Sequence, residues 1–133
     1  MKRLVGLTVL ALAVAALPRS ARGDDKDKIP EIADIMEAHS KTGARAKVAA
    51  AVKAKKWEDA AEPMKEWLKL AEALGKNKPP KGTEVSWKKL TGTYEKTVKT
   101  LATAVEKKNA QSANGALGKI GGMCGTCHKA HRP

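Results

Sequence analysis

The chain has 133 residues, of which 42% are hydrophobic and 30% charged, and its 26 basic residues outnumber the 14 acidic ones to give a formal net charge of +12. This length accommodates one globular domain but not two. The only aromatic residues are three Trp and one Tyr. Because β-branched and aromatic residues are scarce while Ala, Lys, Leu and Glu are strong helix formers, the composition excludes a typical β-sheet protein and favours helices.

The first 23 residues have the pattern of a cleaved secretory signal peptide. A basic start precedes an uncharged run of 14 residues, 4–17, and small residues at the −3 and −1 positions place cleavage before Asp24. A membrane anchor is the alternative, but the run is shorter than the roughly 20 apolar residues that span a bilayer. We therefore expect residues 24–133 to form the mature domain, without a membrane span, in the periplasm.

Apolar residues recur at helical spacing in two segments of the first half of the mature chain. The first segment, 28–41, is followed by Gly43, and the second, 57–74, is stopped by Gly75. Residues 44–54 between them are rich in Ala and Lys. We expect this stretch to be a short helical connector.

A Pro-rich stretch at 78–82 cannot continue a helix, so the third main helix is expected over 86–107 with Ser86 as its N-cap. Asn109 can cap the fourth. This last helix contains five glycines, each of which costs about 1 kcal/mol relative to Ala, so it needs an external stabiliser. Four main helices joined by short links predict an all-α, up-and-down four-helix bundle with one extra helical connector.

The last helix carries the one strong motif, Cys124-Gly125-Thr126-Cys127-His128, which has the C-x-x-C-H pattern of c-type haem attachment. Two thiols three residues apart on one helical turn can each form a thioether with a haem vinyl group, and the adjacent imidazole then faces the iron. Both cysteines of the chain lie in this motif, so at most one haem is attached covalently. A bound haem would also fill space in a core that is poor in aromatic side chains.

Three other interpretations of the motif were weighed. A thioredoxin-like redox pair belongs to a βαβ context that this helical pattern lacks. A structural disulfide fits an exported protein but would cross-link very little chain and leaves His128 unexplained. A zinc site could use Cys124, Cys127, His128 and His131, but structural zinc sites usually draw their ligands from two separated segments.

The C-x-x-C-H motif at the extreme C-terminus of an exported helical protein resembles the cytochrome c′ and cytochrome c-556 group, whereas small class I cytochromes c carry it near the N-terminus. The group pattern C-x-x-C-H-x-x-x-R/K is matched by Cys124, Cys127, His128 and Arg132. The resemblance implies one covalent haem c on the C-terminal helix. It also implies His128 as the proximal iron ligand and Arg132 as the basic residue beside it.

In this group the first helix packs beside the last and faces the second axial position of the iron. Met36 and His39 lie one turn apart on the first predicted helix. His39 would give bis-His iron of relatively low potential, and Met36 would give a His/Met pair of higher potential. If neither reaches the iron, the site is five-coordinate and open to NO or CO, with Ile32 or Ile35 blocking that face.

Three stretches, 79–82, 86–88 and 128–133, also resemble a subgroup of short exported bacterial cytochromes in which the first helix carries a His. This similarity supports His39 among the axial candidates.

His131 lies three residues after His128 on the same helix and cannot reach the opposite haem face, so we expect it to be solvent-exposed or near the haem edge. The aromatic residues are expected to pack against the haem or to fill the core. The hydroxyl of Tyr94 could reach a haem propionate, and a half-buried core position is the alternative.

The resemblance implies a carrier of single electrons between periplasmic partners. The sequence offers no recognisable acid/base pair or catalytic nucleophile, so we do not expect an enzyme. The alternative function is NO or CO binding at five-coordinate iron. Loss of residues 1–23 removes four basic residues and lowers the net charge from +12 to +8, a charge that two haem propionates would reduce further and that favours acidic redox partners. Lysines are spread over every predicted helix, so we expect no nucleic-acid partner. The sequence leaves a homodimer open.

Overall fold

A computed structural model describes residues 28–133, and the predicted signal peptide lies outside this range. The regular structure within it is entirely helical, which confirms the all-α class expected from composition. The helices are α1 (Ile32–Glu37), α2 (Ala44–Lys53), α3 (Trp57–Leu74), α4 (Glu84–Glu106) and α5 (Ala110–His131). Each helix in the described range is too short or too polar to cross a lipid bilayer.

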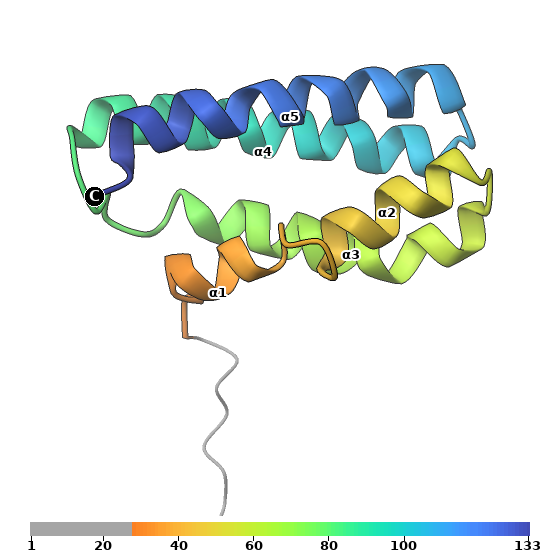
Figure 1. Ribbon diagram of the computed structural model, residues 1–133, viewed down its shortest axis with the longest axis horizontal. Helices are drawn as coiled ribbons and strands as arrows, with labels where there is room; N and C mark the ends of the chain where they lie inside the picture. Colours follow the sequence, from red (N-terminus) through yellow and green to blue (C-terminus); the bar gives the residue numbers. More distant parts are fainter. Residues whose placement is uncertain (1–27) are drawn as a thin grey trace, which may run out of the picture.

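The five helices pack as two hairpins and one short arm. Helices α4 and α5 form one hairpin and α2 and α3 form the other, while α3 packs on α4 to join them (Figure 1). Helix α1 packs mainly against α3. The side-chain amide of Asn77 holds this arm in place, because it donates hydrogen bonds to the carbonyls of Pro30 (3.1 Å) and Ala73 (3.2 Å).

The first predicted helix is much shorter than expected. The sequence predicted a helix over 28–41, but α1 ends at Glu37 and a turn follows over 38–43. Gly43 is the N-cap of α2, and a Cβ atom there would lie only 2.3 Å from the carbonyl oxygen of Ala38. The chain therefore folds back on itself at this glycine, and α1 has no room to continue.

The expected connector is a packed helix of the core. Four residues of α2 are buried in the hydrophobic cluster, whereas α1 contributes Ile35 and the adjoining turn contributes Ala38. The buried residues of α2 are Ala44, Val48, Ala51 and Val52. In the hydrophobic core, α2 thus contributes more buried residues than the first predicted helix does.

Helices α2 and α4 end in the same backbone motif, which the sequence did not signal. Lys55 and Lys108 follow the two C-caps with φ of 56° and 53°, in the left-handed region usually taken by glycine. The amides of Lys56 and Asn109 then bond back to the carbonyls of Ala51 (2.9 Å) and Ala104 (2.8 Å). Two short connections result, and both hairpins depend on them.

The starts of the last two helices are capped by side chains. Ser86 was predicted to cap the third main helix, but Thr83 does so, and its hydroxyl accepts a hydrogen bond from the Ser86 amide (3.2 Å). The helix therefore begins at Glu84. Asn109 caps α5 as predicted, with its side chain bonded to the Ser112 amide (2.9 Å).

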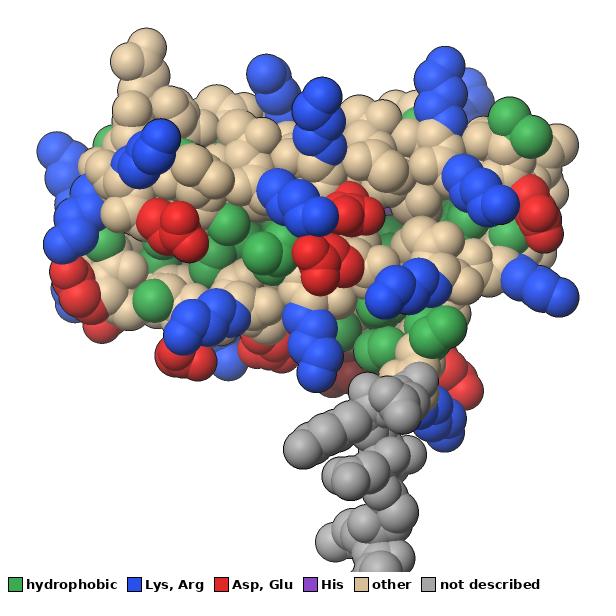
Figure 2. All heavy atoms as spheres, turned by 180° about the vertical axis from the view of Figure 1, so that it is seen from behind, with side chains coloured by type: hydrophobic (Ala, Val, Ile, Leu, Met, Phe, Trp, Pro, Cys, Tyr) green, Lys and Arg blue, Asp and Glu red, His purple; other side chains and the backbone are tan. Residues whose placement is uncertain are grey.

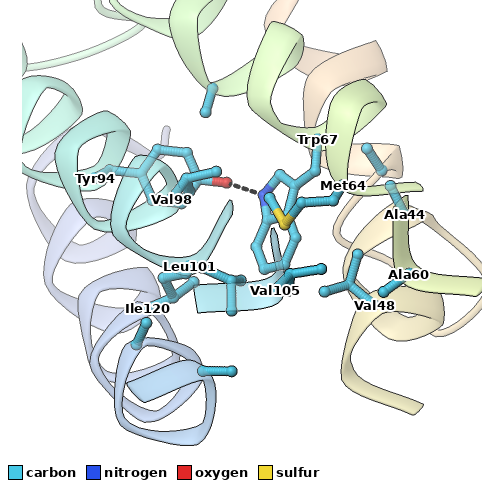
Figure 3. Packing of buried hydrophobic residues seen from close by; sticks show 14 of the residues in the cluster. Ala44, Val48, Ala60, Met64, Trp67, Tyr94, Val98, Leu101, Val105 and Ile120 are labelled. Atoms are coloured by element: carbon cyan, nitrogen blue, oxygen red, sulfur yellow. Dashed lines mark hydrogen bonds between the residues drawn. The ribbon is translucent and has the colours of Figure 1, made fainter. Parts of the chain in front are cut away.

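Trp67 is the largest fully buried side chain of the hydrophobic core, which otherwise contains many small residues. Trp67 lies at its centre, surrounded by aliphatic side chains of α2, α4 and α5 (Figure 3). Along α4, the buried aliphatic residues begin at Val98, whereas residues between Trp87 and Thr97 line a cavity. One end of the molecule is thus closed by packed side chains and the other end is hollow.

Alanine at Gly43 is expected to destabilise the protein by about 1–3 kcal/mol, because the new methyl group would overlap backbone atoms that cannot move away. Gly92→Ala is the matched control. An added Cβ at Gly92 meets no atom within 4 Å, so this substitution should stabilise α4 by about 1 kcal/mol. Urea unfolding followed by circular dichroism measures both changes. Equal effects of the two substitutions would contradict the close approach at Gly43.

Candidate functional site

A cavity of about 910 Å³ occupies the hollow end of the molecule. Its walls come from α1 with the turn that follows, from the first half of α4 and from the last half of α5. Cofactor and ligand pockets in proteins span roughly 300–1,000 Å³. The cavity is therefore large enough for a group of cofactor size.

The C-x-x-C-H motif lines one wall of this cavity. Cys124 and Cys127 are half-buried on α5, and His128 is exposed at the same wall. Both cysteines are free thiols. Burial raises the pKa of the Cys127 thiol, and the nearby Cys124 raises it further, so this sulfur is held protonated. Cys124, Cys127 and His128 therefore line the same cavity, where one bound group could contact all three.

Met36 and His39 line the same cavity from the side of α1. They were predicted to share a face of one helix, but His39 lies in the turn after α1. From the resemblance, the first predicted helix was also expected to pack beside the last. Instead, the cavity separates them, and His39 and His128 line it from different elements.

His39 belongs to a chain of hydrogen bonds that leads into the core. Its Nδ1–H donates to the carbonyl of Ile35 (2.8 Å), because a carbonyl oxygen only accepts. Its Nε2 therefore accepts from the Tyr94 hydroxyl, which itself accepts from the indole N–H of Trp67 (2.6 Å; Figure 3). The chain fixes the tautomer that leaves Nε2 with a lone pair, the form in which histidine binds metals.

The two titratable members of this chain are kept neutral. Burial lowers the pKa of His39, and electrostatic interactions with Arg45 and His128 lower it further, against the effect of the Ile35 hydrogen bond. Burial also raises the pKa of Tyr94 well above its usual range. The sequence analysis considered Tyr94 as a propionate partner or a half-buried core residue. It is a buried residue whose hydroxyl links Trp67 to His39.

The prediction for His131 was wrong in part, because this side chain is buried with 3% of its surface exposed. Its Nδ1–H donates to the carbonyl of Lys81 (2.6 Å), and its Nε2 pairs with the Ser86 hydroxyl (3.1 Å). The ring also packs edge-on against Trp87, with centroids 5.2 Å apart. The loop can approach this closely because Gly82 has φ of +79°, and a Cβ there would lie 3.0 Å from the His131 ring. His131 thus fastens the end of α5 to the loop before α4.

Arg132 is the C-cap of α5, and its side chain is exposed. Its amide bonds to the carbonyl of His128 (2.9 Å), which places it beside the predicted proximal residue. The zinc alternative finds no support in this arrangement. His131 is engaged elsewhere, and in residues 28–133 no three side chains of His, Cys, Asp or Glu gather as a metal site would require.

Basic side chains are dispersed over the surface. The face in Figure 2 carries separate Lys and Arg side chains with carboxylates among them. The ion pairs found in residues 28–133 are exposed to solvent and include Lys99 with Glu95 (2.6 Å) and with Glu72 (3.3 Å). Such exposed pairs contribute little to stability. The cavity, by contrast, is lined by basic residues and by no carboxylate.

Comparisons with protein-family models, with curated proteins and with solved structures find no match to this chain. The functional interpretation therefore rests on the residues and on the cavity that they line.

Tyr94→Phe is expected to destabilise the protein by about 1–3 kcal/mol, because the substitution leaves buried groups of Trp67 and His39 without a partner. Thr100→Ala is the matched control, since it removes an exposed hydroxyl of the same helix that bonds only to the Lys96 carbonyl. That change should stay within about 0.5 kcal/mol. Urea unfolding gives both values, and a Tyr94→Phe variant as stable as the control would contradict the buried chain of hydrogen bonds.

Proposed function

We propose that this protein is an exported monohaem c-type cytochrome that carries single electrons between periplasmic partners. The observation that carries the proposal is that the only two cysteines and His128 line one wall of a cofactor-sized cavity, with His39 and Met36 on another. In this proposal, α2 to α5 with the arm α1 form a variant of the four-helix bundle of the cytochrome c′ and cytochrome c-556 group. The haem would lie at the hollow end, on α5.

The residues of the cavity fit a haem by their chemistry. Cys124 and Cys127 would hold it through two thioethers, and His128 would ligate the iron from the same wall. Haem bound there would supply a one-electron ferric/ferrous couple. Trp87 and Leu90 contribute apolar side chains to the cavity lining. Arg132 would lie next to His128, as the basic residue of the group pattern does.

His39 is the best candidate for the opposite axial position. Its Nδ1–H is fixed by the Ile35 carbonyl, and such an outer hydrogen bond is typical of metal-binding histidines. Its Nε2 is neutral and borders the cavity. Met36 offers a softer ligand from the same arm, but no comparable interaction orients its sulfur.

One observation favours the second candidate function, which is NO or CO binding at five-coordinate iron. The Nε2 atom of His39 accepts the hydroxyl hydrogen of Tyr94. His39 would have to give up this hydrogen bond to ligate a metal ion. If the hydrogen bond between Tyr94 and His39 persists when haem is bound, His39 would not ligate the iron. The iron would then stay open to a small ligand.

Production in a host competent for cytochrome maturation tests the main proposal. We expect the intact mass of the mature chain to exceed that of the polypeptide by one haem, and we expect a Soret band. Cys124→Ala combined with Cys127→Ala should abolish the covalent mass increase. Ser112→Ala, an exposed position on the same helix, is the control and should retain it. A wild-type mass equal to that of the bare polypeptide would refute the proposal.

Optical spectra with and without CO decide between the two functions. If His39 ligates the iron, the wild type is low-spin and unaffected by CO, and His39→Ala becomes high-spin and binds CO, whereas Met36→Leu leaves the spectrum unchanged. If Tyr94 retains His39, the wild type is high-spin and binds CO, and Tyr94→Phe shifts it toward the low-spin form. Conversion by Met36→Leu instead would assign Met36 as the ligand.

A further inference from the structure

The cavity has a marked imbalance of charge. Four basic side chains line it, from Arg45, Lys89, Lys119 and Arg132, and no Asp or Glu does. Lysine chains extend readily into water and keep their charge hydrated. Arg45 differs, because it is half-buried on the first turn of α2, between the turn after α1 and the last helix.

The Arg45 guanidinium lies against the motif helix. Its Nη2 atom is 3.7 Å from the point where a Cβ of Gly121 would stand, one turn before Cys124. A methyl group at position 121 would therefore be in ordinary van der Waals contact with the guanidinium, which places the Arg45 charge close to this part of α5. The charge of Arg45 also reaches His39, where it adds to the effect of burial that lowers the pKa, and Tyr94, where it opposes the larger effect of burial that raises the pKa.

Arg45 forms none of the ion pairs found in residues 28–133. Holding a guanidinium partly out of water next to apolar side chains is costly unless an anion accompanies it. The planar guanidinium group can donate two parallel hydrogen bonds to one carboxylate, which a lysine cannot do. The missing partner of Arg45 is therefore expected to be a carboxylate inside the cavity.

We propose that Arg45 is the carboxylate-binding residue of this cavity and pairs with a haem propionate. This inference rests on the proposed function, because haem is the carboxylate-bearing occupant that the motif indicates. Arg45 would fix how the porphyrin is turned within the cavity, with one propionate directed toward the start of α2. Cys124 and Cys127 would attach the haem covalently, and Arg45 would add a second, non-covalent attachment through the carboxylate.

Binding of ferric haem and of its dimethyl ester tests the inference without any reference to electron-transfer activity. The full mature chain with Cys124→Ala and Cys127→Ala keeps binding reversible, and titration of the Soret absorbance gives both dissociation constants. We expect the free acid to bind at least about tenfold more tightly than the ester, as a hydrogen bond to a charged group would produce. This comparison requires no change at Arg45.

Substitutions at Arg45 then assign the preference. Arg45→Gln should remove most of the advantage of the free acid and leave ester binding unchanged, and Arg45→Lys should keep part of it as a point charge. Lys53→Gln, on the same helix but outside the cavity, is the charge-matched control and should keep all of it. Circular dichroism verifies that each variant folds. If Arg45→Gln does not fold, Arg45→Lys and the acid–ester comparison with Arg45 unchanged decide the inference.

Equal affinity for acid and ester, binding of neither, or a preference that survives Arg45→Gln would overturn the inference. The intact-mass experiment decides haem attachment separately. A chain that gains the mass of haem yet binds acid and ester equally would therefore refute the role of Arg45 and leave the proposed function standing.

Discussion

The hydrogen-bonded chain from Trp67 through Tyr94 to His39 is the interaction on which the rest of the molecule depends. It joins α3, α4 and the turn after α1, which lie far apart in the sequence. Buried polar groups must find partners, so these three elements can adopt only an arrangement that satisfies all three side chains. These hydrogen-bonded side chains also lie at the boundary between two regions of the molecule. Beyond it on α4 the side chains are packed, and before it they line the cavity.

The hollow end persists because short polar contacts, rather than packed apolar side chains, hold its borders. His131 fastens α5 to the loop before α4, and Asn77 fastens the segment before α1 to the end of α3. The two halves of α5 therefore differ in role. Its first half contributes Ala113, Ala116 and Ile120 to the core, while its second half presents the cysteine motif to the cavity.

Three titratable groups around the cavity are held in their neutral forms. Burial keeps the imidazole of His39, the phenol of Tyr94 and the thiol of Cys127 uncharged, and the charged groups on the lining are basic. The cavity is thus a positive environment with apolar walls, which suits a flat, apolar group that carries carboxylates.

The amino-acid sequence by itself determined the helical class, the extents of α3 and α4 to within two residues, the start of α5 and the spacing of the cysteine motif on it, because periodicity, capping residues and a five-residue pattern are local properties. It overestimated α1 and treated α2 as a connector, since the close approach at Gly43 depends on a carbonyl five residues earlier in a folded turn. It could not find Arg45 as a cavity residue or Tyr94 as the partner of His39. Those roles arise only when distant elements meet, so the tertiary structure alone decided which polar groups share the cavity and which charge is left without a partner.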